Sequence, residues 1–237
     1  MNPYELAIGQ TVSFLVDVLR SGRRVLEVGC GRGEVARRLA AGGFQVTALD
    51  RALPDPSPAP GVTFVECDFL EFDHGRFDAV VFTASLHHIS LLGAAIDRAH
   101  QLLAPGGLVV ADEFDLDAPG RETLRWYYGV QELLAAAELF PRERVDPPGS
   151  DIVQRWRLAH VHDPPLHTGV AMRQAIAERF DLRDVQRGAY LYRYVTRRLP
   201  HDARGVAIAQ HIHATERRGI TDGTLSAVGL RILAARA

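Results

Sequence analysis

One short stretch, residues 25–33, constrains the fold of this chain more than any other. Its first four residues are apolar apart from one acid, which predicts a buried parallel strand. Glycines stand at positions 29, 31 and 33, and residues 34–40 then predict a helix. Glycine permits a tight turn, and the N–H groups at a helix N-terminus can bind a ligand. The stretch therefore predicts a ligand site at a strand–turn–helix junction of an α/β protein.

The spacing of the glycines distinguishes between ligands. A dinucleotide-binding turn has the pattern G-x-G-x-x-G, whereas this chain has Glu27 and then G-x-G-x-G, with no glycine at position 34. Because an acid precedes the first glycine by two residues, the stretch resembles the first motif of class I S-adenosylmethionine-dependent methyltransferases. An ordinary strand-to-helix turn of an α/β protein is the alternative.

The resemblance implies a role for each part of this motif. The carboxylate of Glu27 would stabilise the positively charged end of S-adenosylmethionine, the implied cofactor. The backbone of the turn would lie beside the amino-acid tail and the ribose of the same molecule. The cofactor-binding residues implied in this way are Gly29, Cys30, Gly31 and Gly33.

A second predicted strand, residues 44–50, ends in an acid about 20 residues after the glycines, the spacing found in nucleoside-binding folds. A carboxylate there can accept hydrogen bonds from both hydroxyls of a ribose. We therefore expect Asp50 to bind the ribose, with Arg51 beside it in the cofactor site. The same acid would suit NAD, so Asp50 alone does not separate the two ligands.

Two further strand ends extend the predicted cofactor site. Residues 62–65 predict a third strand, and Asp68 and Phe69 follow it. They resemble the methyltransferase motif in which an acid contacts the adenine amino group and the next residue packs near the ring. A surface turn is the alternative. Residues 77–82 predict the fourth strand, whose end at Thr83 is predicted to border the cofactor.

A Leu-His-His sequence follows the fourth strand and resembles that of family members acting on small molecules. A histidine can act as a general base at neutral pH. His87 is therefore the first candidate base, and His160 and His162 come next. A structural role, with the ring hydrogen-bonded to a loop, is the alternative for His87 and for His88.

A Leu-x-Pro-Gly-Gly turn at 103–107, before a fifth strand at 108–114, is a second specific resemblance to these methyltransferases. Residues 115–167 then interrupt the alternation of strands and helices. Since ligands bind at the carboxyl ends of strands in open α/β sheets, we expect this helical insertion to be a substrate lid. Aromatic side chains there could line a pocket or form the insertion's own core. The substrate-binding candidates are Tyr127, Trp156 and Arg193.

Residues 189–197 alternate in polarity and predict a sixth strand, and residues 225–234 predict a seventh. The resemblance implies a Rossmann-like α/β fold with helices on both faces. Its seven-stranded, mostly parallel sheet would have the order 3-2-1-4-5-7-6, with the last strand antiparallel. We expect residues 1–114 to form the cofactor half of one domain, 115–167 the lid, and 168–237 the remainder of the same domain.

Composition excludes several classes of function. The chain has 237 residues, 47% of them hydrophobic, and a net charge of -2, so a nucleic-acid partner is not favoured. Cys30 and Cys67 lack zinc spacing and suggest a reducing compartment. We expect no metal site, no membrane span and no secretory signal, which makes the cytoplasm the default location. The expected partner is a small-molecule substrate, and a homodimer is left open.

These features together predict an enzyme that transfers a methyl group from S-adenosylmethionine to a small molecule by direct in-line displacement. The sulfonium is already strongly electrophilic, so the protein supplies orientation, desolvation and, for some acceptors, a base. Two alternatives remain. One is an S-adenosylmethionine-binding module without catalysis that supports a partner enzyme. The other is an NAD-linked oxidoreductase, which the missing third glycine of the dinucleotide pattern disfavours.

Overall fold

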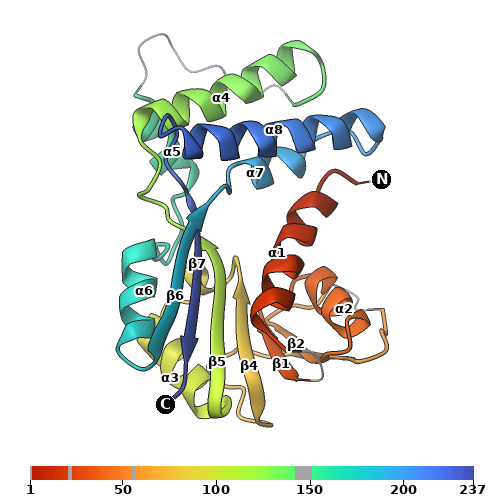
Figure 1. Ribbon diagram of the computed structural model, residues 1–237, viewed down its shortest axis with the longest axis vertical. Helices are drawn as coiled ribbons and strands as arrows, with labels where there is room; N and C mark the ends of the chain where they lie inside the picture. Colours follow the sequence, from red (N-terminus) through yellow and green to blue (C-terminus); the bar gives the residue numbers. More distant parts are fainter. Residues whose placement is uncertain (1, 21–22, 55–56, 142–150) are drawn as a thin grey trace. The chain divides into compact units, whose positions relative to one another are not determined.

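A computed structural model describes residues 2–20, 23–54, 57–141 and 151–237. Its central feature is a seven-stranded sheet in the order β3-β2-β1-β4-β5-β7-β6 (Figure 1). Strands β1 to β5 pair in parallel, and β7 runs in the opposite direction to its neighbours. The predicted Rossmann-like fold class and strand order are therefore confirmed. The strands are β1 (Arg24–Val28), β2 (Gln45–Asp50), β3 (Val62–Glu66), β4 (Phe77–Thr83), β5 (Leu103–Phe114), β6 (Asp181–Gly188) and β7 (Gly229–Ala235).

The chain divides into two compact units. The first, which we call the sheet unit, comprises residues 10–114, 164–186 and 230–237. The second, the helical unit, comprises residues 1–9, 115–163 and 187–229. The helical unit contains α4 (Arg121–Ala136), α5 (Ile152–Ala159), α7 (Tyr192–Thr196) and α8 (Ala203–Thr221). Residues 115–163 of the predicted insertion thus group with a later part of the chain, and the role of the insertion as a lid stays a prediction.

Helices cover both faces of the sheet (Figure 1). On one face, Thr11 of α1 (Glu5–Val18) donates a hydrogen bond to Asp112 of β5 over 2.6 Å. Arg231 of β7 donates to the same buried carboxylate over 3.0 Å. On the other face, α3 (Leu92–Leu102) and α6 (Gly169–Ala177) pack together, and fully buried Met172 and Ile176 join the main core. The remaining helices of the sheet unit are α2 (Glu34–Ala41) and the short 3-10 helix η1 (Leu86–His88).

The central strands end together at one edge of the sheet. Val28, the last residue of β1, lies opposite Leu49 of β2 and Phe82 of β4. The strand order reverses between β1 and β4, because the chain passes from β1 outward to β2 and β3 before it returns. Ligands bind at such reversal points in open α/β sheets. The topology therefore places the glycine turn where a ligand site is expected.

The Leu-x-Pro-Gly-Gly turn is also present. Leu103 pairs with Phe77, whereas the next registered pair joins Leu108 to Ala79. Strand β5 therefore carries more residues than its partner between these two pairs, and the excess bulges out as a turn. Gly106 takes a φ of 70°, in the left-handed region that favours glycine.

The prediction of a sixth strand at 189–197 is wrong. The sixth strand is β6, and residues 192–196 form the helix α7 instead. Strand β6 is at the edge of the sheet and is mostly exposed, with charged residues along its length. Charged side chains are common on edge strands, where they oppose pairing with other chains. Such a strand lacks the apolar alternation by which strands are recognised in a sequence.

A buried carboxylate explains why residues 190–192 leave the sheet pattern. Glu216 of α8 is 1% exposed and accepts three backbone N–H groups. The donors are Tyr190 at 2.7 Å, Leu191 at 2.9 Å and Tyr192 at 2.9 Å. Burial raises the pKa of Glu216 above its usual value. The N–H groups that a strand would give to a neighbouring strand are thus bound by a side chain, and the helix begins there.

Removing this carboxylate should destabilise the protein. Glu216→Ala leaves three buried N–H groups without an acceptor, at about 1–3 kcal/mol for each group that water cannot reach. Glu216→Gln keeps one accepting oxygen, so its loss of unfolding free energy should be smaller. Urea denaturation followed by circular dichroism measures both. Unfolding of Glu216→Ala at the wild-type urea concentration would contradict the structural role.

Candidate functional site

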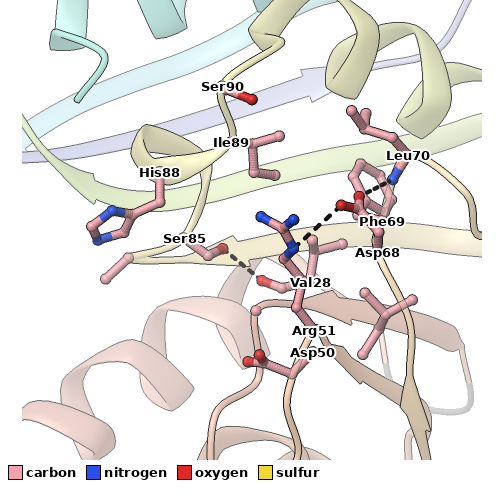
Figure 2. A pocket seen from close by; sticks show the side chains of 13 residues that line it. Val28, Asp50, Arg51, Asp68, Phe69, Leu70, Ser85, His88, Ile89 and Ser90 are labelled. Carbon is pink, nitrogen blue, oxygen red and sulfur yellow. Dashed lines mark hydrogen bonds and ion pairs between the residues drawn. The ribbon is translucent and has the colours of Figure 1, made fainter. Parts of the chain in front are cut away.

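A cavity of about 360 Å³ lies at the carboxyl ends of the central strands (Figure 2). The ends of β1 and β2 and the loops after β3 and β4 contribute to its wall, so residues distant in sequence meet there. The wall combines apolar side chains with carboxylates, an arginine and a histidine. The lining residues are Val28, Gly29, Leu49, Asp50, Arg51, Asp68, Phe69, Leu70, Ala84, Ser85, His88, Ile89 and Ser90.

The glycine turn forms one side of this cavity. Gly29, Gly31 and Gly33 have φ values of 75°, 54° and 73°, which L-residues with a side chain rarely adopt. The N–H of Gly29 donates to the carbonyl of Leu49 over 2.8 Å, and the N–H of Gly31 donates to Asp50 Oδ2 over 2.8 Å. The turn is therefore held to the end of β2 by hydrogen bonds from its own backbone.

The surroundings of two of these glycines differ. A Cβ at Gly29 would lie 2.4 Å from the Cβ of Ser85, so this position has no space for a side chain. At Gly31, nothing lies within 4 Å of the point that a Cβ would occupy, so the backbone there faces open space. Gly29 is thus needed for close packing between strand ends, whereas the backbone of Gly31 is open to a ligand.

Alanine at each position should separate these two roles. Gly31→Ala should lower the free energy of unfolding by about 1–2 kcal/mol, the cost of the left-handed backbone alone. Gly29→Ala should lower it by about 1–3 kcal/mol more, because the new methyl overlaps Ser85. Chemical denaturation of both variants tests this difference. Equal stability of the two variants would show that Ser85 can move away from the new methyl group without loss of unfolding free energy.

Glu27 is the last residue but one of β1 and is 1% exposed. One carboxylate oxygen, Oε1, accepts a hydrogen bond from Thr83 Oγ1 over 3.1 Å. The other, Oε2, is buried and has no hydrogen-bond partner among the described residues. Burial raises the pKa of Glu27 from 4.5 to about 8. A buried carboxyl with an unfilled acceptor is costly for the fold and is suited to a cationic group of a ligand.

The pKa of Glu27 should be visible in the pH dependence of stability. The folded state keeps the proton up to about pH 8, whereas the unfolded chain releases it near pH 4.5. The free energy of unfolding should therefore fall as pH rises from about 4.5 to about 8. Glu27→Gln should lose this part of the slope. Denaturation curves at several pH values test it, and identical slopes for variant and wild type would contradict the burial of an ionisable group.

The other predicted cofactor residues occupy different places. Arg51 and Asp68 form an ion pair, with 3.3 Å between Nε of Arg51 and Oδ2 of Asp68, and both side chains line the cavity. Phe69, which also lines it, is 3% exposed and packs edge-on against Phe82, with 5.6 Å between ring centroids. Burial raises the pKa of the Cys30 thiol to about 12, so this cysteine is no nucleophile at neutral pH.

The loop after β4 is built on a second buried carboxylate, which sequence reasoning missed. Glu113 of β5 is 0% exposed, and its Oε1 accepts the N–H groups of Ser85 at 2.9 Å and Leu86 at 2.7 Å. Its Oε2 lies 2.5 Å from Nδ1 of His87. The chain turns into this loop through Ala84, a non-glycine residue with φ 55°. Two adjacent acids, Asp112 and Glu113, near the end of an apolar run were the signal available in the sequence.

His87 and His88 have opposite surroundings. The ring of His87 is buried, 4% exposed, and is held by Glu113. His88 is exposed, lines the cavity, and its ring centroid lies 4.2 Å from that of His87. Of these two histidines, His88 is the one that lines the cavity. The catalytic role predicted for His87 stays a prediction.

The helical unit gathers several of the predicted substrate residues into one aromatic cluster. Trp156 lies edge-on to Tyr127, with ring centroids 5.9 Å apart. Nδ1 of His160 lies 2.8 Å from the carbonyl of Trp156, and its Nε2 lies 3.1 Å from the hydroxyl of Tyr194. The guanidinium of Arg193 lies over the ring of Tyr190, and this ring in turn contacts Tyr194. His162 is exposed in the same unit.

Two further observations concern metals and membranes. Among the described residues, no group of three or more histidine, cysteine, aspartate or glutamate side chains is arranged to hold a metal ion. In the same part of the chain, no helix combines the length and the apolar character needed to cross a bilayer.

Comparison with known families identifies the fold and its class. The family model described as a methyltransferase domain matches residues 3–144, which include the glycine turn and every residue that lines the cavity. The match spans more than half of the chain. This protein therefore belongs to the methyltransferase-domain family.

Individual relatives match a smaller part. An uncharacterised methyltransferase of Mycobacterium bovis is 38% identical over 99 residues, which are 38% of this chain and 50% of the relative. The mitochondrial arginine hydroxylase NDUFAF5 of Mus musculus is 32% identical over 108 residues, 43% of this chain and 32% of the relative. The matched region thus covers half or less of each of these relatives.

Solved structures share the fold over nearly the whole chain. The 1,6-didemethyltoxoflavin-N1-methyltransferase of Burkholderia thailandensis, solved with S-adenosylhomocysteine, aligns with a TM-score of 0.55 and 21% identity, covering 98% of this chain and 78% of that one. An S-adenosylmethionine-dependent methyltransferase of Mesorhizobium loti aligns with a TM-score of 0.57 and 18% identity, covering 99% and 98%. At these identities the likeness concerns the fold.

Proposed function

We propose that the cavity binds S-adenosylmethionine and that the protein transfers the methyl group to a small-molecule acceptor. The observation that carries the proposal is that the glycine turn and the end of β2 meet at one cavity: Gly29 and Asp50 both line it, and Asp50 accepts the N–H of Gly31. Membership of the methyltransferase-domain family supports it. A fold relative solved with S-adenosylhomocysteine supports the choice of ligand.

The residues present fit this ligand. Asp50 would accept hydrogen bonds from the ribose hydroxyls, and Asp68 with Phe69 would contact the adenine. The amino-acid tail would lie along the glycine turn, where a Cβ at Gly31 would have nothing within 4 Å. Glu27 would meet the positive end of the ligand, which explains a buried carboxyl oxygen without a partner among the described residues. Thr83 would keep Glu27 oriented through its hydroxyl.

When bound, S-adenosylmethionine supplies a methyl group on a positively charged sulfur, ready for direct displacement by a nucleophile. The chain contributes orientation and a dry environment, because the cavity wall is partly apolar at Val28, Leu49 and Phe69. Tyr127, Trp156 and Arg193 remain the candidates for binding the acceptor. Their cluster of aromatic rings and a guanidinium suits a flat or anionic small molecule.

Three other functions are tested together with this one. A cofactor-binding module without catalysis would bind S-adenosylmethionine and transfer nothing. An NAD-linked oxidoreductase would bind NADH instead. Some matched relatives are named arginine hydroxylases, so a hydroxylation reaction is the third.

Two measurements distinguish these functions. Isothermal titration calorimetry with S-adenosylmethionine and with NADH should show binding of the former alone. Mass spectrometry of an acceptor panel of phenols, amines and nitrogen heterocycles should show an added methyl group. An added oxygen atom would favour a hydroxylase. Binding of NADH without binding of S-adenosylmethionine would overturn the proposal.

One substitution tests the assignment of the ribose site. Asp50→Ala should weaken S-adenosylmethionine binding by about 1–3 kcal/mol, the cost of an unpaired buried hydrogen-bonding group. Glu66→Ala is the matched control. Glu66 pairs in register with Asp50, so its replacement removes the same charge at the same sheet edge, but Glu66 does not line the cavity. Equal effects of the two variants in calorimetry would remove Asp50 from the site.

A further inference from the structure

The loop after β4, residues 84–90, forms a continuous part of the cavity wall. In Figure 2, the side chains of Ile89 and Ser90 lie across the cavity from Asp50. Under the proposed function, this loop is therefore the wall opposite the ribose site. The members of the loop that line the cavity are Ala84, Ser85, His88, Ile89 and Ser90.

Neighbouring strands hold the first half of this loop. Glu113 of β5 accepts the N–H groups of Ser85 and Leu86 and binds the ring of His87. The hydroxyl of Ser85 donates to the carbonyl of Val28 at the end of β1. These bonds fix the loop as far as His87, so the second half of the wall depends on other contacts.

One distant residue, His167, binds the second half of the loop at two points. Its backbone N–H donates to the carbonyl of His87 over 3.0 Å. Its ring nitrogen Nε2 lies 2.9 Å from the carbonyl of Ile89, 78 positions away in the sequence. Because a carbonyl oxygen only accepts, Nε2 is the donor of this bond. His167 therefore holds the backbone of the cavity wall on both sides of His88.

The core fixes the position of His167 independently of the loop. The next residue, Thr168, caps α6 by accepting a backbone N–H over 3.2 Å. Helix α6 in turn buries Met172 and Ile176 in the main core. The two prolines at 164–165 restrict the backbone that leads into His167. The histidine thus comes from a rigid segment, and the loop is the part that it holds.

The place of His167 in the chain gives these bonds a further meaning. His167 is the last residue of the predicted insertion, residues 115–167, and the chain re-enters the sheet unit at Pro164. It also lies beyond residues 3–144, which the methyltransferase-domain model matches. The end of the insertion is therefore bonded to the cavity wall by a residue outside the matched domain.

We propose that His167 is a positioning residue for the cofactor: it fixes the second half of the loop 84–90 against the ligand and couples the end of the insertion to occupancy of the cavity. This inference rests on the proposed function. His167 is outside the cavity wall, so it acts through the backbone of Ile89. Because coupling between two sites is reciprocal, a bound ligand should also strengthen the bonds of His167 to the loop.

Three substitutions of His167 in the full chain test the donor role of its ring. Calorimetry with S-adenosylhomocysteine should show binding weakened about fivefold to tenfold in His167→Ala, the effect of about one lost hydrogen bond. A glutamine amide nitrogen can take the place of Nε2, so His167→Gln should stay within about threefold of the wild type. The shorter side chain of His167→Asn cannot reach Ile89, so this variant should behave as His167→Ala does.

Thr168→Ala is the matched control for a general loss of stability. It removes the cap of α6 next to His167 and leaves both donors of His167 in place. Its melting temperature should fall, while its affinity for S-adenosylhomocysteine should change less than about twofold. Equal loss of affinity in Thr168→Ala and His167→Ala, or wild-type affinity of His167→Ala, would overturn the proposal. If His167→Ala does not fold, equal affinities of the glutamine and asparagine variants would overturn it.

Hydrogen exchange read by mass spectrometry tests the coupling directly. In the wild type, S-adenosylhomocysteine should slow exchange in residues 84–90 and also at the N–H of His167, which is outside the cavity wall. In His167→Ala, residues 84–90 should exchange faster than in the wild type. Protection of the loop with unchanged exchange at His167 would overturn the coupling. Failure of the wild type to bind S-adenosylhomocysteine would instead overturn the proposed function, so the two failures are distinguishable.

Discussion

The close approach of β1 and β4 at the glycine turn is the constraint on which the rest of the site depends. Ser85 donates a hydrogen bond to the carbonyl of Val28 over 2.5 Å, and its Cβ occupies the space that a side chain at Gly29 would need. Because the two strand ends meet without intervening atoms, the loop after β4 is held beside the turn after β1. The cavity lies between these two segments, the end of β2 and the loop after β3.

Two buried glutamates near this edge differ in how completely their carboxyl groups are hydrogen-bonded. Glu113 has both oxygens engaged by the loop after β4, so its burial is compensated and the loop is rigid. Glu27 has one oxygen engaged by Thr83 and the other without a partner among the described residues. The first carboxylate completes the scaffold. The second costs stability, because a buried polar oxygen without a partner is unfavourable.

Local signals in the sequence predicted most of the sheet but only part of the site. The first five strands and the glycine turn were recognisable because apolar runs and glycine spacing are properties of neighbouring residues. Strand β6 was missed because an exposed edge strand has no apolar alternation. Helix α7 was misread because Glu216, distant in sequence, binds the N–H groups of Tyr190, Leu191 and Tyr192 where the helix begins. Glu113 was missed for the same reason, since its partners become neighbours only in the folded sheet.

The histidines illustrate why residue type alone does not assign a chemical role. His160 has both ring nitrogens engaged: a carbonyl only accepts, so Nδ1 donates to Trp156, and Nε2 is then left to accept from the Tyr194 hydroxyl. That ring is held at both nitrogens and is part of an aromatic cluster. A histidine becomes a usable base only where the fold leaves a nitrogen lone pair beside a cavity and near water. In this chain, the groups that folding brings beside each histidine ring decide whether that ring has a structural role or can accept a proton.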